Sequence, residues 1–291
     1  MGQDLYEASP EARSLYDQAD AALGFSLSGI SFQGPEEKLT DTSVCQPALY
    51  THGLALLAAL KKECPDFAFA AAAGLSLGEY TAHAAAGSFD FVTGLKLVQN
   101  RGRLMQEACA KTQGGMVSLI GATADQAVEV AREADLDTAN FNCPGQIVLS
   151  GPSAHIPAAV AAAQKRGIKR AIPLKVAGAY HSRLMAHAEE ALRPFLASAS
   201  IPGPRVIVVA NVTGEPVKTA EDIRASLARQ VTGSVRWETC IRTLIGAGIH
   251  EFIELGPGGV LAGLLKRIDP AVPCLSVGTY AQLKDTLPKL A

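Results

Sequence analysis

The chain has 291 residues, of which 48% are hydrophobic and 5% aromatic, and its formal net charge is −2. A chain of this length and composition can form one large globular domain, or one large and one small domain. The nearly balanced charge, without a long basic block, excludes the electrostatic footprint of a nucleic-acid-binding protein.

Targeting signals and metal motifs are also missing from the sequence. The longest nearly apolar run, residues 67–77, is too short to span a membrane, and the first ten residues lack the basic start and apolar core of a secretory signal. The six cysteines lie far apart and form no C-x-x-C pair. They therefore favour free thiols in a cytoplasmic protein without a bound metal.

Helix and strand patterns alternate along the chain, which is typical of an α/β fold. A serine N-cap, a first-turn proline and an acid at Ser9-Pro10-Glu11 predict a helix start, and Gly24 predicts its end. Longer patterns predict helices over 46–62 and 91–110, and strands over 67–74, 205–212 and 249–255.

The segment 113–177 has its own rhythm of elements. Its patterns predict, in order, strand 116–120, helix 123–134, strand 136–142, strand 146–150, helix 153–166 and strand 169–174. The order β-α-β-β-α-β is the ferredoxin-like arrangement. We therefore expect a small subdomain at 113–177, inserted into a larger α/β domain made of residues 1–112 and 178–291.

The heptapeptide Gly74-Leu-Ser-Leu-Gly-Glu-Tyr80 follows the predicted strand 67–74. G-x-S-x-G between a strand and a helix is the nucleophile elbow, in which the serine hydroxyl stands clear of the sheet. The Leu77 N–H would then stabilise an oxyanion, and side chains at Gly74 and Gly78 would obstruct the close approach of strand and helix. Many such matches are plain turns, so a non-catalytic Ser76 remains the alternative.

A nucleophilic serine needs a base, and His181 has the most suggestive position. It follows Gly178 just after a predicted strand, where the chain can re-enter the large domain. Taken alone, a capping or packing histidine is the more common explanation. His83 lies two turns beyond Ser76 on the next helix, and His155 belongs to the subdomain. His52 and His250 resemble half-buried structural histidines.

Arg101 interrupts an apolar face of the predicted helix 91–110. All four residues that share its face are apolar: Leu97, Val98, Leu104 and Met105. A buried guanidinium is costly unless an anion meets it, and its fork suits a carboxylate. The partner is either an internal carboxylate or a substrate carboxylate held near Ser76.

Together these residues resemble the malonyl-CoA:acyl carrier protein transacylases and the related acyltransferase domains of polyketide synthases. The resemblance covers nearly the whole chain. It is carried by the blocks DLYEASPEAR, CQPALYTHGLAL, GLSLGEYTA, QNRGRLMQEA, FNCPGQIVLSG, GAYHSRLM, NVTGEPV, QVTGSVRW and IELGPGGVLAGLLKRI. It implies a hydrolase-like α/β domain, with a parallel sheet and an inserted ferredoxin-like subdomain.

The resemblance also implies roles for residues at matching positions. Ser76 would be the nucleophile and His181 its general base. Gln230 would orient His181 through its backbone carbonyl, where hydrolases use an acid. Arg101 would pair with the malonyl carboxylate. Three further residues match positions that line the family's cleft: Gln46, Asn142 and Gln146.

The implied reaction is ping-pong transfer of malonyl from malonyl-CoA, through Ser76, to the phosphopantetheine thiol of acyl carrier protein in fatty-acid synthesis. We expect no bound cofactor, no nucleic-acid or membrane partner, and a monomer. A polyketide-type acyltransferase that selects methylmalonyl is the alternative within the class, and GAYHS resembles the malonyl type more closely.

Two other classes remain open. A carboxylesterase would share G-x-S-x-G, but it needs serine, acid and histidine in that chain order and has no use for Arg101. A non-catalytic carrier-binding scaffold, or a degraded copy of the enzyme, is the third possibility.

The sequence departs from the family pattern at two places. Leu75 stands where the family usually has histidine before the nucleophile, and we expect the change to be tolerated because that residue packs in the cleft. In addition, family members begin with a strand and a Phe-x-Gly-Gln-Gly-x-Gln loop that supplies the second oxyanion N–H. This sequence aligns from just after that loop, so we expect a central strand and half the oxyanion hole to be absent.

The second departure gives a test. Loss of one oxyanion donor costs on the order of 10²–10³ in kcat. We predict that the 291-residue chain folds poorly and is weakly active. Adding about 12 upstream residues should restore both properties, because a central strand pairs the backbone groups of its neighbours. Equal malonyl-transfer rates for the shorter and the extended chain would contradict this prediction.

Overall fold

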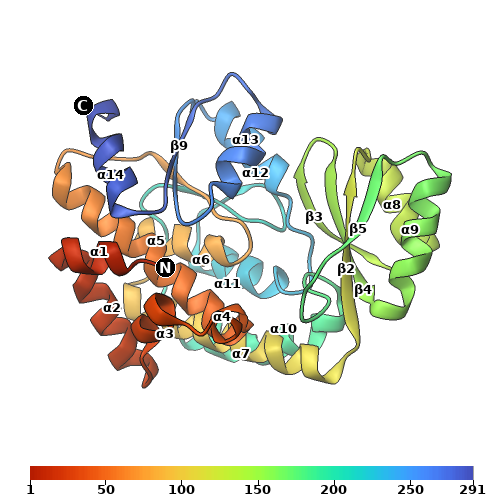
Figure 1. The fold of residues 1–291 in the computed structure, drawn as a ribbon, viewed down its shortest axis with the longest axis horizontal. Coiled ribbons are helices and arrows are strands. Elements are labelled where there is room, and N and C mark those ends of the chain that lie inside the picture. The colour runs from red at the N-terminus through yellow and green to blue at the C-terminus, as the bar shows by residue number, and fades with distance from the viewer. Residues whose placement is uncertain (291) are drawn as a thin grey trace.

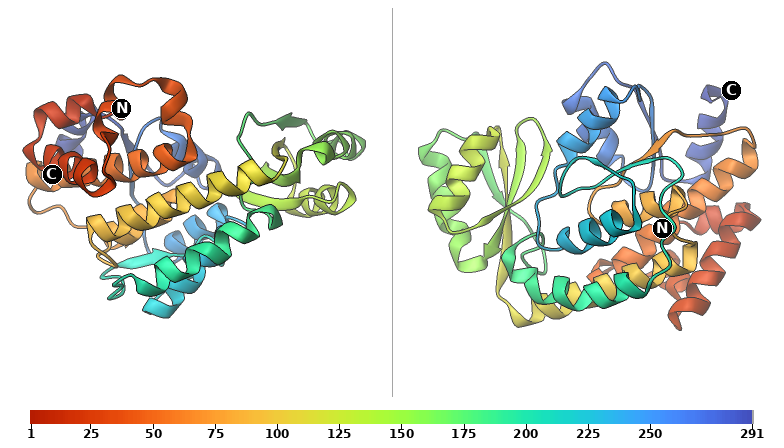
Figure 2. Two further views of the ribbon diagram at one scale, coloured as in Figure 1. Left: turned by 90° about the horizontal axis from the view of Figure 1, so that it is seen from below. Right: turned by 180° about the vertical axis from the view of Figure 1, so that it is seen from behind.

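A computed structural model describes residues 1–290 and shows an α/β protein (Figure 1). A four-stranded sheet with helices α8 and α9 on one face lies at one end of the molecule, and the other helices gather around two short sheets. Helices α7 and α10 run side by side toward the four-stranded sheet (Figure 2). Among residues 1–290, no helix combines the length and the apolar character that a membrane span requires.

The helices before the four-stranded sheet are α1 (Gln3–Ala8), α2 (Pro10–Leu23), α3 (Leu27–Gln33), α4 (Glu36–Thr40), α5 (Thr42–Glu63), α6 (Leu77–Ala85) and α7 (Phe91–Lys111). Those after it are η2 (Arg183–Met185), α10 (Ala186–Ser198), α11 (Ala220–Arg229), α12 (Trp237–Gly246), α13 (Val260–Ile268), α14 (Tyr280–Thr286) and η3 (Leu287–Lys289).

The segment 113–177 contains β2 (Gly114–Ile120), α8 (Ala124–Glu133), β3 (Asp137–Cys143), β4 (Gln146–Pro152), η1 (Ser153–His155), α9 (Ile156–Lys165) and β5 (Arg170–Pro173). The sheet order is β3-β4-β2-β5, and all neighbours are antiparallel. These are the six elements predicted for this segment, with boundaries that differ by at most three residues. Alternating apolar residues on β2 and β4 pack against α8 and α9 in a core of their own.

The predicted strands outside that segment are shorter than expected. Strand β1 covers only Ala71–Ala72, β6 only Ile207–Val209, and β8 only Phe252–Leu255. β1 pairs in parallel with β6, which continues to β7 (Pro216–Val217), while β8 pairs in parallel with β9 (Cys274–Val277). The alanine run at 70–73 lacks the β-branched side chains that stabilise a pleated surface, and β1 has a strand partner on one edge only within residues 1–290.

The predicted helices agree better with the structure. Ser9 caps α2 by accepting a hydrogen bond from the Ala12 N–H at 3.2 Å, and Gly24 ends the helix with φ 75°. Helix α7 matches its prediction within one residue. Helix α5 begins four residues before the predicted 46–62, so Pro47 lies inside the helix rather than in its first turn.

The entry and exit of the segment 113–177 lie next to each other. A Cβ at Gly114 would come within 2.4 Å of the Ala179 backbone nitrogen, so only glycine permits this approach. The sheet is also joined to the rest of the chain along β3. The Phe141 N–H donates to the Val235 carbonyl at 2.9 Å, and the Val235 N–H donates to the Ala139 carbonyl at 2.8 Å.

The turn before α6 depends on one of the two glycines that the motif contains. A Cβ at Gly74 would lie 1.9 Å from the Gly78 carbonyl oxygen, which no side chain can occupy. A Cβ at Gly78 would meet nothing within 4 Å. The expectation of obstruction is therefore right for Gly74 and wrong for Gly78, where the added atom points into open space.

This difference predicts opposite outcomes for two matched substitutions. Gly74→Ala should displace the turn and destabilise the protein by about 2 kcal/mol or more, because backbone rather than a flexible side chain must move. Gly78→Ala should be neutral or stabilising by up to about 1 kcal/mol, from its better helix propensity. Urea denaturation of both variants checks this, and equal loss of stability would contradict it.

Candidate active site

Ser76 lies between β1 and α6 in a strained conformation. Its backbone has φ 54° and ψ −106°, a region that non-glycine residues rarely occupy. Two contacts hold the turn. The Ser76 N–H donates to Asn211 Oδ1 at 2.6 Å, and the Ser76 carbonyl accepts from Gln230 Nε2 at 2.8 Å. The surrounding chain therefore determines where the hydroxyl stands.

Leu77, the predicted oxyanion donor, is the first residue of α6. The first amides of a helix have no acceptor within the helix, and the helix dipole favours negative charge beside them. The next two amides, of Gly78 and Glu79, donate to the Leu75 and Ser76 carbonyls at 2.9 and 3.2 Å. The Leu77 N–H is therefore the amide of this turn that suits an oxyanion formed next to Ser76.

His181 meets Ser76 although the two residues are far apart in sequence. Ser76 Oγ and His181 Nε2 are 2.8 Å apart, and His181 Nδ1 lies 2.7 Å from the Gln230 carbonyl oxygen. Because a carbonyl can only accept, Nδ1 carries the proton, and Nε2 is left as an acceptor for the serine proton. The contact expected between His181 and the Gln230 backbone is present.

The environment of His181 keeps its ring neutral. Burial, followed by the positive charge of Arg101, lowers the pKa of His181 to about 4, against the opposing effect of the hydrogen bond to Gln230. Only 4% of the residue is exposed, and its φ of 56° adds a second strained position beside Ser76. A neutral imidazole at pH 7 can accept a proton from the hydroxyl.

Arg101 lies in the apolar face of α7, as its neighbours in the sequence predicted. It is 1% exposed, and all four residues of its face are buried. Arg103, two residues further along α7, is exposed and pairs with Glu107. The guanidinium also lies over the Tyr80 ring, with its central carbon 5.6 Å from the ring centroid.

The partners of the Arg101 guanidinium are neutral oxygens. Nη2 donates to Ser76 Oγ at 3.0 Å and to Gln230 Oε1 at 2.8 Å, and Nη1 donates to Gln46 Oε1. Within residues 1–290 it forms no salt bridge with a carboxylate, and its Nε has no hydrogen-bond partner. A buried cation with spare donors at a serine hydroxyl is well suited to receive an anionic ligand.

The other predicted binding residues differ in their placement. Gln46 is buried and belongs to the cluster through Arg101. Asn142 and Gln146 lie at the β3–β4 hairpin and are not hydrogen-bonded to the cluster. Gln146 Oε1 accepts from Arg267 Nη1 at 2.6 Å, while the buried Asn142 Oδ1 has no partner within residues 1–290.

Two residues of the cluster, Glu79 and Asn211, were not predicted from the sequence. Glu79 is fully buried, and its Oε2 accepts from Gln230 Nε2 at 2.6 Å and from the Asn211 N–H at 3.1 Å. Burial raises the pKa of Glu79 to about 7, although the hydrogen bonds from Gln230 and Asn211 oppose this shift. The only signal in the sequence was an acid three residues after the candidate nucleophile.

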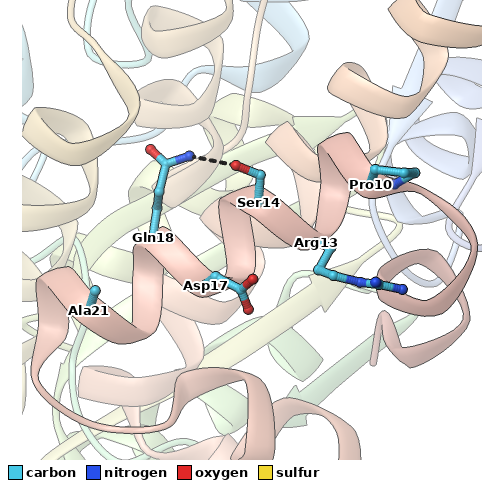
Figure 3. Close-up of a pocket in the computed structure, with 6 residues that line it drawn as sticks. All are labelled: Pro10, Arg13, Ser14, Asp17, Gln18 and Ala21. Carbon is cyan, nitrogen blue, oxygen red and sulfur yellow. Dashed lines mark hydrogen bonds between the residues drawn. The ribbon is translucent and has the colours of Figure 1, made fainter.

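A cavity of 520 Å³ opens beside His181. One wall comes from the four-stranded sheet and α8, the other from the chain before α12. Its lining residues are Val128, Asp137, Thr138, Phe141, His181, Arg183, Thr232, Gly233, Ser234 and Arg236. A second hollow, of 410 Å³, lies along α2 (Figure 3). All its lining residues belong to that one helix, which is distant in sequence from the residues around the first cavity. It contains none of the predicted site residues.

Other sequence expectations are resolved more simply. Leu75 is partly buried and packs against the apolar cluster around Trp237. His52 is fully buried and hydrogen-bonded to Tyr16, and His250 is exposed, so the expectation that both are half-buried was wrong. Burial follows from packing between distant helices, which the local sequence does not report.

No group of three metal-ligating side chains occurs within residues 1–290.

The geometry can be compared with known proteins. The acyl transferase domain family matches residues 1–285. A malonyl CoA-acyl carrier protein transacylase of Bacillus subtilis is 40% identical over 284 residues, 95% of this chain and 88% of that protein. The crystal structure of a malonyl CoA-acyl carrier protein transacylase from Clostridium perfringens has a TM-score of 0.95 and 35% identity, covering 100% of this chain and 92% of that one.

A third similar protein was solved with a partner. It is the malonyl-transacylase in a complex with its type II PKS acyl-carrier protein, with a TM-score of 0.93 and 36% identity, covering 99% of this chain and 94% of that one. The family match covers 285 of the 291 residues, and a curated relative is 40% identical over 95% of the chain. This chain belongs to the acyl transferase family, among the malonyl CoA-acyl carrier protein transacylases.

Proposed function

We propose that this protein transfers the malonyl group from malonyl-CoA to the phosphopantetheine thiol of acyl carrier protein, for fatty-acid synthesis. The observation that carries the proposal is the Arg101 guanidinium, which is buried 3.0 Å from Ser76 Oγ without a carboxylate partner in residues 1–290. A malonyl thioester has a carboxylate and a reactive carbonyl at opposite ends of a short chain. It can therefore meet the cation and the hydroxyl together.

In the first half-reaction, Ser76 Oγ attacks the thioester carbonyl while His181 Nε2 takes the hydroxyl proton. The Leu77 N–H stabilises the tetrahedral oxyanion. The intermediate collapses with cleavage of the carbon–sulfur bond, and the leaving CoA thiolate receives the proton from His181. The product is malonyl-Ser76 with its carboxylate on Arg101.

In the second half-reaction, the phosphopantetheine thiol gives its proton to His181 and attacks the ester carbonyl of malonyl-Ser76. The carbon–oxygen bond to Ser76 breaks, and His181 returns the proton to Oγ. The Gln230 carbonyl keeps the imidazole in the tautomer that both steps require and stabilises the imidazolium between them. Gln46 holds Arg101 from the other side, and Asn142 and Gln146 remain weaker candidates for contacts in the cleft.

We also propose the finer description of the chain. Residues 113–177 form a ferredoxin-like subdomain, and residues 1–112 and 178–291 form a hydrolase-like domain. The six-element order of the segment supports the first, and the strand–serine–helix turn at Ser76 supports the second. The protein acts without a bound cofactor, as a cytoplasmic monomer whose partner is acyl carrier protein.

A polyketide-type acyltransferase is the second candidate. The likeness to a malonyl-transacylase solved with a type II PKS acyl-carrier protein favours it. The two differ in the carrier protein and, for a polyketide-type enzyme that selects methylmalonyl, also in the acyl group. Transfer rates to a fatty-acid carrier and to a polyketide carrier from the same organism separate them.

The adduct on Ser76 gives the main test. Incubation with malonyl-CoA should add the mass of one malonyl group to the intact protein, and Ser76→Ala should abolish the adduct. Arg101→Ala should slow malonylation about 10- to 100-fold, because a charge-assisted carboxylate pair is lost, while acetylation from acetyl-CoA changes little. Arg103→Ala, on the solvated face of α7, is the matched control and should leave both rates unchanged.

The alternative classes give different results in the same experiment. A carboxylesterase would hydrolyse a nitrophenyl ester equally well with Arg101 or with alanine. A non-catalytic scaffold would acquire no adduct at all. Either outcome would overturn the proposed function.

The pKa of His181 predicts a pH dependence. Neutral His181 is the base, so acylation of Ser76 by a nitrophenyl ester should persist down to about pH 5 and fail as the pH approaches the lowered pKa. Arg101→Ala removes a neighbouring cation, which raises the pKa of His181 and should move the acid limb up by about one pH unit. Arg103→Ala should not move it, and coincident profiles for all three proteins would contradict the prediction.

A further inference from the structure

The reaction described above does not use the buried carboxylate beside the Gln230 side chain. Glu79 is 0% exposed, on the first turn of α6, and no cation pairs with it directly within residues 1–290. Its Oε2 accepts two hydrogen bonds, one from Gln230 Nε2 and one from the Asn211 N–H. Its Oε1 has no partner in the same range. A buried acid with such one-sided bonding needs an explanation.

The Gln230 side chain links Glu79 to the catalytic cluster. Its Nε2 donates to Glu79 Oε2 at 2.6 Å and to the Ser76 carbonyl at 2.8 Å, and its Oε1 accepts from Arg101 Nη2 at 2.8 Å. The amide therefore lies between an acid and a cation, with its NH₂ toward the acid and its oxygen toward the cation. The backbone carbonyl of the same residue accepts from His181.

We propose that Glu79 is a positioning residue for malonyl selection, which fixes the Gln230 amide so that its oxygen faces Arg101 and holds the guanidinium at Ser76. This inference rests on the proposed function, since Arg101 discriminates between acyl groups only if it receives the malonyl carboxylate. Glu79 itself touches neither substrate nor reacting atoms.

The polarity of the amide is what Glu79 determines. Glu79 Oε2 already accepts from the Asn211 N–H, so it is an acceptor here, and it binds the NH₂ end of Gln230 and not the oxygen end. With the amide turned over, its NH₂ group would face the Arg101 donors, and two sets of donors would oppose each other. The Arg101 fork would then lose an acceptor, along with the contact that holds it beside the hydroxyl.

Asn211 extends the same control to the backbone of the nucleophile. Its N–H binds Glu79, its Oδ1 accepts from the Ser76 N–H at 2.6 Å, and its Nδ2 donates to the Gly74 carbonyl at 2.9 Å. Glu79 thus binds the two residues whose side chains contact the Ser76 N–H and the Ser76 carbonyl, Asn211 through its backbone N–H and Gln230 through its side-chain amide. The nucleophile and the cation are placed relative to each other by one carboxylate.

Two substitutions separate the hydrogen bond from the charge. Glu79→Gln keeps the length of the side chain and can keep an acceptor oxygen at the Oε2 position. Its NH₂ group then takes the position of Oε1, which has no hydrogen-bond donor nearby in residues 1–290 that would oppose it. Glu79→Asp keeps the charge but withdraws the carboxylate by one methylene. The matched control is Glu254→Asp, which shortens another buried glutamate whose carboxylate accepts from the Leu261 and Ala262 amides.

The measurement is the ratio of the Ser76 acylation rates from malonyl-CoA and from acetyl-CoA, followed by intact mass. Damage to the fold lowers both rates, whereas a misplaced Arg101 lowers only the malonyl rate. Glu79→Asp should reduce the ratio about tenfold, as expected for loss of a hydrogen bond to a charged group, and Glu79→Gln should keep it within about threefold. Glu254→Asp should lower the melting temperature and leave the ratio unchanged.

A second measurement tests whether the effect passes through Gln230. In a Gln230→Ala background, Glu79→Asp should change the ratio by less than about twofold, because coupled residues are not additive. The proposal is wrong if Glu79→Asp leaves the malonyl-to-acetyl ratio unchanged, or if Glu79→Gln lowers it as much as Glu79→Asp does. It is also wrong if Glu79→Asp lowers the ratio equally in the wild-type and the Gln230→Ala proteins. A wild-type protein without any malonyl adduct would instead overturn the proposed function, and this inference with it.

Discussion

The site depends on a buried guanidinium that is solvated by neutral oxygens. Taking a cation out of water costs several kcal/mol unless hydrogen bonds replace its hydration shell. Around Arg101 that shell is built from the Gln46 and Gln230 side chains and the Ser76 hydroxyl. Because none of these is an anion, the positive charge is not neutralised by a carboxylate within residues 1–290.

The same charge shapes the rest of the chemistry. Burial is the larger cause of the lowered pKa of His181, and the Arg101 charge adds to it, whereas the same charge opposes the effect of burial on the pKa of Glu79. A lysine at position 101 could supply the charge but not the planar guanidinium fork. In Arg101 that fork reaches Ser76 Oγ and Gln230 Oε1 from Nη2, and Gln46 Oε1 from Nη1. In the proposed function, substrate recognition by Arg101 and proton transfer by His181 therefore depend on one group of interacting charges.

Much of this unit could be predicted from local sequence patterns. Ser76 is identified by a strand–turn–helix motif, and Arg101 by the apolar residues three and four positions away. The six elements of 113–177 follow from clear changes of period between helix and strand. The role of Gln230 was predicted from the family resemblance alone. Every residue type has a backbone carbonyl, so the sequence gives no sign of which carbonyl contacts His181.

The parts that could not be predicted depend on distant contacts. Glu79 resembles an ordinary acid in the first turn of a helix, where the dipole favours it, and only the approach of Gln230 and Asn211 shows that it is buried. Strand β1 was predicted too long because an alanine run is apolar enough for a strand yet has little β preference. Gly78 was assigned a steric role that belongs to Gly74 alone, since the motif does not reveal which face of the turn is crowded.

The close approach of Gly114 and Ala179 lets one wall of the cavity come from a segment that leaves and re-enters the rest of the chain at one place. This segment has a hydrophobic core of its own. Ser76 precedes it and His181 follows it in the chain, and its two ends meet at Gly114 and Ala179. Residues of β3 and α8 therefore line the cavity, whereas every side chain that is hydrogen-bonded to Ser76 comes from outside this segment.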